Sequence, residues 1–171
     1  LTTNGGGCVV DAVSQISSEE YPLFSIAVMK ENNTNELVHL NDDVVLSILS
    51  KDVDGRVIET FGMHSMKELN KFDEVETLEV GDIRVPSDII GYMELKVEDR
   101  LENETHTVLI CRYEHGKVLE EEKEELTYNY YRKHKDDYIQ VMTETNKKAW
   151  VCTMCGYVYY GDEIPEDFSC P

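Results

Sequence analysis

The stretch Tyr92-Met93-Glu94-Leu95-Lys96-Val97-Glu98 decides the fold class, because apolar and charged residues alternate along it. Successive side chains of a β-strand point to opposite faces, so Met93, Leu95 and Val97 share one face. Residues 105–113 form a second apolar-rich run, and the polar residues 99–104 between the two runs are typical of a turn. The two runs therefore predict an antiparallel hairpin with one face in a core.

Further apolar runs lie on the N-terminal side of this hairpin. Residues 23–29 (LFSIAVM) and 44–49 (VVLSIL) are short and continuous, which is typical of buried strands. A run rich in small and β-branched residues, 8–16, follows three glycines and predicts another strand. Strands and helices do not alternate regularly, so we expect a mainly β fold, an antiparallel barrel with short helices.

Two short helices are predicted between these strands. The first begins near residue 34, with Thr34 or Asn33 as its N-cap, and the second covers residues 54–61 and ends at Gly62. Residues 63–87 have weak periodicity and several turn-forming residues, which indicates a stretch that is mostly loop.

The composition limits the possible functions. The 171 residues suit one domain and a small appendage, and 16 Lys and Arg against 35 Asp and Glu give a formal charge of −19. Such a charge repels nucleic acid, and no apolar run approaches the roughly 20 residues that cross a bilayer.

No signal peptide is evident and the five cysteines do not resemble a disulfide framework, so we expect a reducing cytoplasm. Because the chain begins at Leu1 rather than Met, and ends within a motif, we expect it to be incomplete at both ends.

The C-terminal tail carries a second, independent signal. Cys152 and Cys155 form a C-x-x-C pair followed by Gly156, and Cys170 lies near the end. Thiolates placed in this way select iron or zinc, so the tail reads as three ligands of a four-cysteine metal site. Spacing alone leaves a structural zinc knuckle as an open alternative.

The letters of the tail, WVCTMCGYVYYGDE, with a later C-P pair, resemble the rubredoxin domain. That resemblance implies one iron bound by Cys152, Cys155 and Cys170, with a fourth cysteine beyond this chain. Four thiolates around one iron make a one-electron carrier.

The preceding part resembles the FMN-binding split barrel of flavin reductases and flavoredoxins. The similarity lies in residues 8–17, 22–30, 33–37, 45–50, 61–62, 71–72, 105–107 and 128–132. A split barrel joined to a rubredoxin is similar to the high-molecular-weight rubredoxins of anaerobic bacteria. We therefore expect a split barrel over residues 1–135, a linker over 136–148 and a rubredoxin-like domain over 149–171.

The resemblance also implies a set of FMN contacts. The isoalloxazine ring is expected along the first complete strand, and the phosphate near the predicted first helix. Each position also has an ordinary interpretation, such as an N-cap for Thr34, an exposed side chain for Lys71, polar packing for His106 or a dimer contact for Tyr130. The expected cofactor-binding residues are Asp11, Ala12, Val13, Ser14, Gln15, Ser17, Lys30, Asn33, Thr34, Lys71, His106 and Tyr130. Cys8 and Cys111 are expected to be buried thiols without a redox role.

The resemblance implies a flavin-dependent oxidoreductase. FMN, reduced by NAD(P)H or by a partner, would pass electrons to the iron and then to an acceptor protein, such as a flavodiiron-type reductase, and the chain would form a homodimer. Two alternatives stay open: a flavin reductase that supplies free reduced FMN, and a non-enzymatic module that binds zinc.

Overall fold

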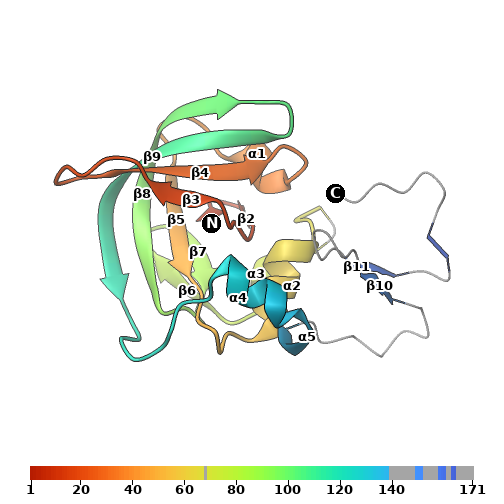
Figure 1. The fold of residues 1–171 in the computed structure, drawn as a ribbon. Helices are drawn as coiled ribbons and strands as arrows, with labels where there is room; N and C mark the ends of the chain where they lie inside the picture. The colour runs from red at the N-terminus through yellow and green to blue at the C-terminus, as the bar shows by residue number, and fades with distance from the viewer. Residues whose placement is uncertain (68, 139–148, 152–157, 161–162, 165–171) are drawn as a thin grey trace.

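The computed structural model describes residues 1–67, 69–138, 149–151, 158–160 and 163–164. Short strands and a few short helices alternate irregularly along the chain (Figure 1). The strands are β1 (Thr2–Thr3), β2 (Gly6–Gly7), β3 (Val13–Gln15), β4 (Leu23–Met29), β5 (Asp43–Ile48), β6 (Thr77–Val80), β7 (Ile83–Pro86), β8 (Gly91–Glu102), β9 (His106–Val118), β10 (Ala149–Val151) and β11 (Val158–Tyr160). The helices are α1 (Asn33–Leu37), α2 (Gly55–Met63), α3 (Lys71–Glu74), α4 (Tyr128–Lys133) and α5 (Lys135–Tyr138).

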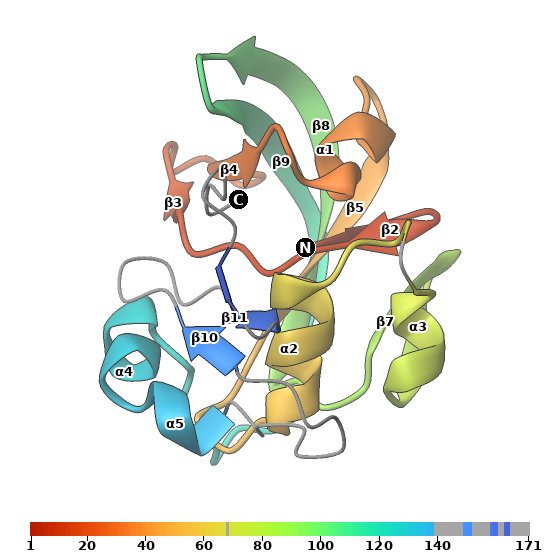
Figure 2. The same cartoon turned by 90° about the vertical axis from the view of Figure 1, so that its right-hand side faces the viewer.

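Seven strands form one sheet in the order β2-β1-β5-β8-β9-β4-β3. Every neighbouring pair in it is antiparallel, which confirms the mainly β, antiparallel part of the predicted fold. The edge strands β2 and β3 follow one another in the chain. Six residues from Gly7 to Val13 can span about 20 Å, whereas six strand spacings in a flat sheet would need about 29 Å. The sheet must therefore curl far enough for this short segment to connect β2 and β3, which stand on opposite sides of the view in Figure 2.

The hairpin β8–β9 is the longest element, and its core-facing residues are as the alternation predicts. Leu95 and Val97 are buried, and Val97 pairs with the buried Cys111. The turn is shorter than expected, because β8 continues to Glu102 and only residues 103–105 separate the strands. The outer half of this hairpin extends beyond the core, so its strands carry polar residues that resemble a turn.

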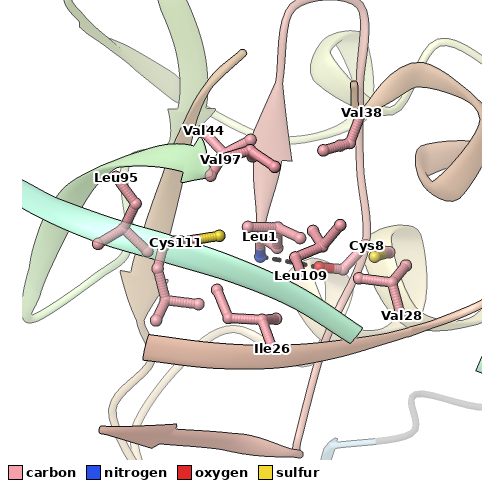
Figure 3. Close-up of a cluster of buried hydrophobic side chains, with 11 residues drawn as sticks. Leu1, Cys8, Ile26, Val28, Val38, Val44, Leu95, Val97, Leu109 and Cys111 are labelled. Atoms are coloured by element: carbon pink, nitrogen blue, oxygen red, sulfur yellow. Dashed lines mark hydrogen bonds between the residues drawn. The ribbon is translucent and has the colours of Figure 1, made fainter. Parts of the chain in front are cut away.

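The interior of the curled sheet holds the main apolar cluster (Figure 3). Strands β4, β5, β8 and β9 all contribute to it, so the buried faces of four strands enclose a common interior. Burying such side chains stabilises the fold by roughly 1.5–3 kcal/mol each. The cluster consists of Leu1, Cys8, Ile26, Val28, Val38, Val44, Leu46, Leu95, Val97, Leu109 and Cys111.

A second hairpin, β6–β7, lies in the stretch that was predicted to be mostly loop, so that prediction is wrong. Val80 and Ile83 flank a two-residue connection, and Gly81 there has a φ of +58°. Glycine adopts this left-handed conformation without strain, which suits a tight hairpin turn. The hairpin packs against Val45, on the face of β5 opposite the main cluster. In the sequence, residues 80–83 (VGDI) carried the signal for this hairpin turn.

Both predicted short helices exist, with different ends. Asn32, rather than Thr34 or Asn33, is the N-cap of α1, and its side chain makes no capping hydrogen bond. Asp54 caps α2 by accepting a hydrogen bond from the N–H of Arg56. Gly62 lies within α2 and does not take the left-handed conformation with which a glycine ends a helix.

The helices α2, α3 and α5 share a further apolar cluster outside the sheet. It contains Phe61, Phe72 and Tyr138, and Tyr130 and Tyr131 of α4 pack against it. The Tyr138 hydroxyl donates a hydrogen bond of 2.6 Å to the carbonyl of Lys51. Packed structure thus continues at least to Tyr138, into the range that was predicted as linker.

Candidate functional site

The edge strand β3 carries most of the predicted ring contacts. It pairs through Val13 with Ile26 and through Gln15 with Phe24 of β4, and no strand among the described residues covers its other side. The side chains of Asp11, Ala12, Ser14 and Gln15 are exposed, while Val13 and Ser17 are partly buried.

The hydrogen bonds of β3 show which main-chain groups stay open. The carbonyl of Ala12 accepts from Ala27 N–H, and the N–H of Ile16 donates to the Leu23 carbonyl. In an antiparallel pair, alternate residues point their N–H and C=O groups at the partner strand. Val13 and Gln15 therefore direct their main-chain donors and acceptors away from β4. These main-chain N–H and C=O groups can form hydrogen bonds with the edge of a planar heterocycle.

The turn after β3 uses its polar side chains locally. The hydroxyl of Ser17 accepts from the N–H of Leu23 at 2.8 Å, and the Gln15 amide donates to the Ser17 carbonyl at 2.6 Å. These bonds fix the β3–β4 connection. The Gln15 and Ser17 side chains thus stabilise the end of β3.

Lys30 and His106 meet at one end of the sheet. His106 pairs with Met29, and the N–H of Lys30 donates to the Thr105 carbonyl. The Lys30 ammonium lies 3.2 Å from a carboxylate oxygen of Glu102 in an exposed pair, and Nδ1 of His106 lies 2.8 Å from the Thr105 hydroxyl. Because β3 runs antiparallel to β4, its Asp11 end lies beside the Lys30 end of β4.

Helix α1 lies at the same end, just after Lys30. Thr34 is buried in the structure, whereas Asn33 is partly exposed and donates to Glu36 at 3.1 Å. The side-chain amide of Asn35 donates to the Val28 carbonyl at 2.9 Å.

Asn35 also links α1 to the β8–β9 hairpin. Its side-chain oxygen accepts from the Thr107 hydroxyl at 3.2 Å and from the Arg100 guanidinium at 3.3 Å. Asn35 was not predicted as a site residue, because its buried contacts connect residues up to 72 positions apart.

Two carboxylates of this region have cationic partners. Glu36 accepts a hydrogen bond from the Lys67 ammonium at 3.0 Å, and this bond lowers the pKa of the Glu36 carboxyl. Glu102 pairs with Lys30. Glu36 and Glu102 are therefore each paired with a lysine.

Lys71 lies in a different environment. It is the first residue of α3, is only 1% exposed, and its ammonium donates to the carbonyls of Gly7 and Phe61 at 2.9 Å and 3.3 Å. The alternative interpretation of Lys71 as an exposed lysine is wrong, because the sheet edge and α2 enclose it. Its predicted flavin contact stays a prediction.

Tyr130 lies on α4, which in both views is far from α1 along the vertical axis (Figures 1 and 2). Its ring stacks on His134 with 4.0 Å between centroids, and the Lys51 ammonium lies 4.7 Å from the Tyr130 centroid. These residues line a hollow of about 540 Å³. The structure does not join this hollow to the β3 edge by any described hydrogen bond or ion pair.

The predicted metal ligands Cys152, Cys155 and Cys170 lie outside the described residues. On either side of the first two, β10 and β11 pair antiparallel, Val151 opposite Val158. Cys8 and Cys111 are buried free thiols, as predicted.

The chain is similar to known proteins in sequence. A family model described as "Flavin reductase like domain" matches residues 1–138. The chain is 28% identical over 194 residues to a protein named "High molecular weight rubredoxin" from Moorella thermoacetica, covering 96% of this chain and 84% of that one.

Solved structures share the fold at low sequence identity. The NADH:FAD oxidoreductase SgcE6 of Streptomyces globisporus C-1027 has a TM-score of 0.62 at 18% identity, covering 72% of this chain and 75% of that one. A flavoredoxin from Methanosarcina acetivorans has a TM-score of 0.57 at 17% identity and covers 66% of this chain. The match spans 61% of the flavoredoxin, less than two thirds of its length. None of the helices in the described ranges is long and apolar enough to span a bilayer.

Proposed function

The chain belongs to the flavin reductase like domain family, and on that premise we propose that it is an oxidoreductase that binds FMN along the open edge of β3. One observation carries the proposal: the main-chain groups of Val13 and Gln15 point away from the sheet at an exposed edge. The ring edge of a flavin presents alternating donors and acceptors, which such a row can bind. Main-chain recognition explains how small or acidic side chains, such as Ala12 and Asp11, are tolerated here.

The phosphate is proposed to lie toward Lys30. The Asp11 end of β3, the Lys30 ammonium and α1 all lie at one end of β4. A ligand extended along β3 would place its anionic group near this ammonium, with the partly exposed Asn33 as a further donor. Binding would then compete with the exposed ion pair between Lys30 and Glu102.

A bound FMN would allow the protein to accept two electrons from a donor and to release them one at a time. The chain's own residues need only bind and orient it. No proton transfer by a side chain is required for this role.

We propose that the electrons pass to an iron held by Cys152, Cys155 and Cys170 with a fourth thiolate, and from there to an acceptor protein. The name of the Moorella thermoacetica relative supports this part. NAD(P)H is the proposed donor, directly or through a partner, and a flavodiiron-type reductase is the proposed acceptor. A homodimer is also proposed.

Spectroscopy of the intact protein tests these proposals together. Yellow flavin bands and red ferric-thiolate bands should both appear, and anaerobic titration with NADH should bleach the flavin bands before or together with the iron bands. A protein with one zinc and no flavin would contradict the proposal and support the non-enzymatic module.

A second function is favoured by the exposure of the β3 side chains. Asp11, Ala12, Ser14 and Gln15 leave the site open to solvent, which would permit flavin to dissociate between turnovers. The chain would then reduce free flavin. The name of the Streptomyces protein, an NADH:FAD oxidoreductase, pairs NADH with a flavin for that protein. Loss of FMN during gel filtration, with rapid reduction of added FMN by NADH, would favour this function. Retention of FMN would exclude it.

A further inference from the structure

Lys71 is the most deeply buried of the lysine, arginine, aspartate and glutamate side chains that the structure describes. It is 1% exposed, and its ammonium donates to main-chain carbonyls from two different segments. Gly7 ends the edge strand β2, and Phe61 lies in the last turns of α2. One ammonium thus ties the end of β2 to α2.

The same contact region holds the chain that leads into β3. The carbonyl of Phe61 also accepts the N–H of Val9 at 3.1 Å. Beyond it, the carbonyl of Ala12 is fixed to β4 through Ala27. Between these two anchors only Val10 and Asp11 lie, so a shift at Val9 must move the start of the flavin strand.

The packing around Gly7 is close. A Cβ at Gly7 would approach the Thr2 methyl to 2.7 Å and the Phe61 ring to 3.0 Å. The Phe61 ring in turn lies 5.7 Å from the Lys71 ammonium. A buried ammonium is costly unless polar acceptors surround it. Replacing Lys71 by an apolar residue therefore removes a hydrogen-bond donor from the carbonyls of Gly7 and Phe61.

We propose that Lys71 is a positioning residue, which sets the place of the open β3 edge by holding Gly7 and Phe61 together and does not itself contact the flavin. The inference rests on the proposed function, because it assumes that FMN binds along β3. Lys71 would thus act on the flavin site through the main chain of residues 7–12. The alternative is that Lys71 contacts the ligand directly.

The test compares Lys71→Met with a control of similar structural cost. Methionine keeps much of the volume of lysine but donates no hydrogen bond. Ile89→Ala removes a buried side chain from the cluster around β6 and β7, away from β3. Apo-protein stability, FMN affinity and the visible spectrum of bound FMN are measured for all three proteins.

We expect Lys71→Met to bind FMN at least tenfold more weakly and to shift the flavin absorption bands, whereas Ile89→Ala lowers stability with wild-type affinity and spectrum. Equal effects of both variants on FMN binding would overturn the inference, as would wild-type binding by Lys71→Met. A wild-type protein that binds no FMN would overturn the proposed function itself, and the inference with it.

If Lys71→Met does not fold, a measurement on the wild type tests whether Lys71 contacts the flavin. With ¹⁵N-labelled lysine, the Lys71 ammonium should give a protected NMR signal that is nearly unchanged when FMN is added. A large shift of this signal, or a nuclear Overhauser effect to flavin protons, would establish direct contact and overturn the inference.

Discussion

The main chain of Tyr138 lies directly against Gly55, so a Cβ at Gly55 would overlap the Tyr138 carbonyl. The first residue of α2 and the last residue of α5 are thus in contact across 83 positions of sequence. This contact holds α5 against the helix whose other end anchors the strand leading into β3.

Replacing Gly55 by Ala is expected to destabilise the protein by about 1–3 kcal/mol, because the added Cβ must displace α5. The matched control is Gly62→Ala in the same helix, where the nearest atom to the new Cβ would be a Val9 methyl at 3.5 Å. That change should be neutral or stabilise by up to about 1 kcal/mol, since alanine favours helix. Urea unfolding measures both; equal effects would contradict the packing described.

Tyr138→Ala is expected to cost about 3–5 kcal/mol, as for other buried aromatic residues. The ring is 5% exposed and its hydroxyl bonds the Lys51 carbonyl. Asp137→Ala, at the exposed neighbouring position, should change stability by less than about 0.5 kcal/mol. If thermal unfolding shows no difference between the two variants, Tyr138 belongs to a linker rather than to the packed domain.

Lys30→Gln should weaken FMN binding roughly fivefold at low salt, which corresponds to about 1 kcal/mol for one exposed charge pair. Riboflavin lacks the phosphate, so its affinity should not change. Lys96→Gln is the control, because Lys96 is a similarly exposed lysine paired with Asp43. Fluorescence titration of the wild type and both variants with each ligand gives the six constants. A proportional loss for both ligands would place the phosphate elsewhere.

Burial raises the pKa of the Cys111 thiol from its ordinary 9.0 to about 12, with a smaller contribution from Glu98. The unfolded chain therefore loses this proton at lower pH than the folded protein does. The stabilisation is complete below about pH 9 and declines as pH rises toward 12, by at most about 1.4 kcal/mol per pH unit.

Cys111→Val removes this titration while keeping an apolar side chain of similar size. Between pH 9 and 11, urea unfolding under reducing conditions should show a steeper loss of stability for the wild type than for the variant. Parallel curves would mean that Cys111 is not buried as a neutral thiol.

Cys155→Ser should remove the visible absorption of the proposed ferric-thiolate centre and leave the flavin bands in place. Cys111→Val should keep one iron per chain, because Cys111 is buried in the sheet. Metal analysis of both variants accompanies the spectra. Full retention of iron by Cys155→Ser would contradict the proposed ligand set.

Local patterns predicted the elements whose burial follows from residue spacing. The alternation of Met93, Leu95 and Val97 predicted β8, and the apolar run at residues 23–29 predicted β4. The hairpin β6–β7 was missed although Gly81 carried a turn signal, because its strands of four residues are too short for a clear period.

The candidate site was predictable where it depends on position along a strand, as in β3 beside β4. The long-range hydrogen bonds around this site were not predictable. Asn35 and Thr107 are 72 positions apart, and Lys71 and Gly7 are 64 apart, yet each pair is hydrogen-bonded.

The sequence by itself determined that this chain forms antiparallel strands, because side-chain direction alternates within a few residues. Only the tertiary structure decided that Lys71 is buried against the carbonyls of Gly7 and Phe61, rather than exposed on a short helix. The physical reason is that the burial of a lysine depends on which carbonyls the curled sheet brings to its ammonium, and these belong to segments far apart in the chain.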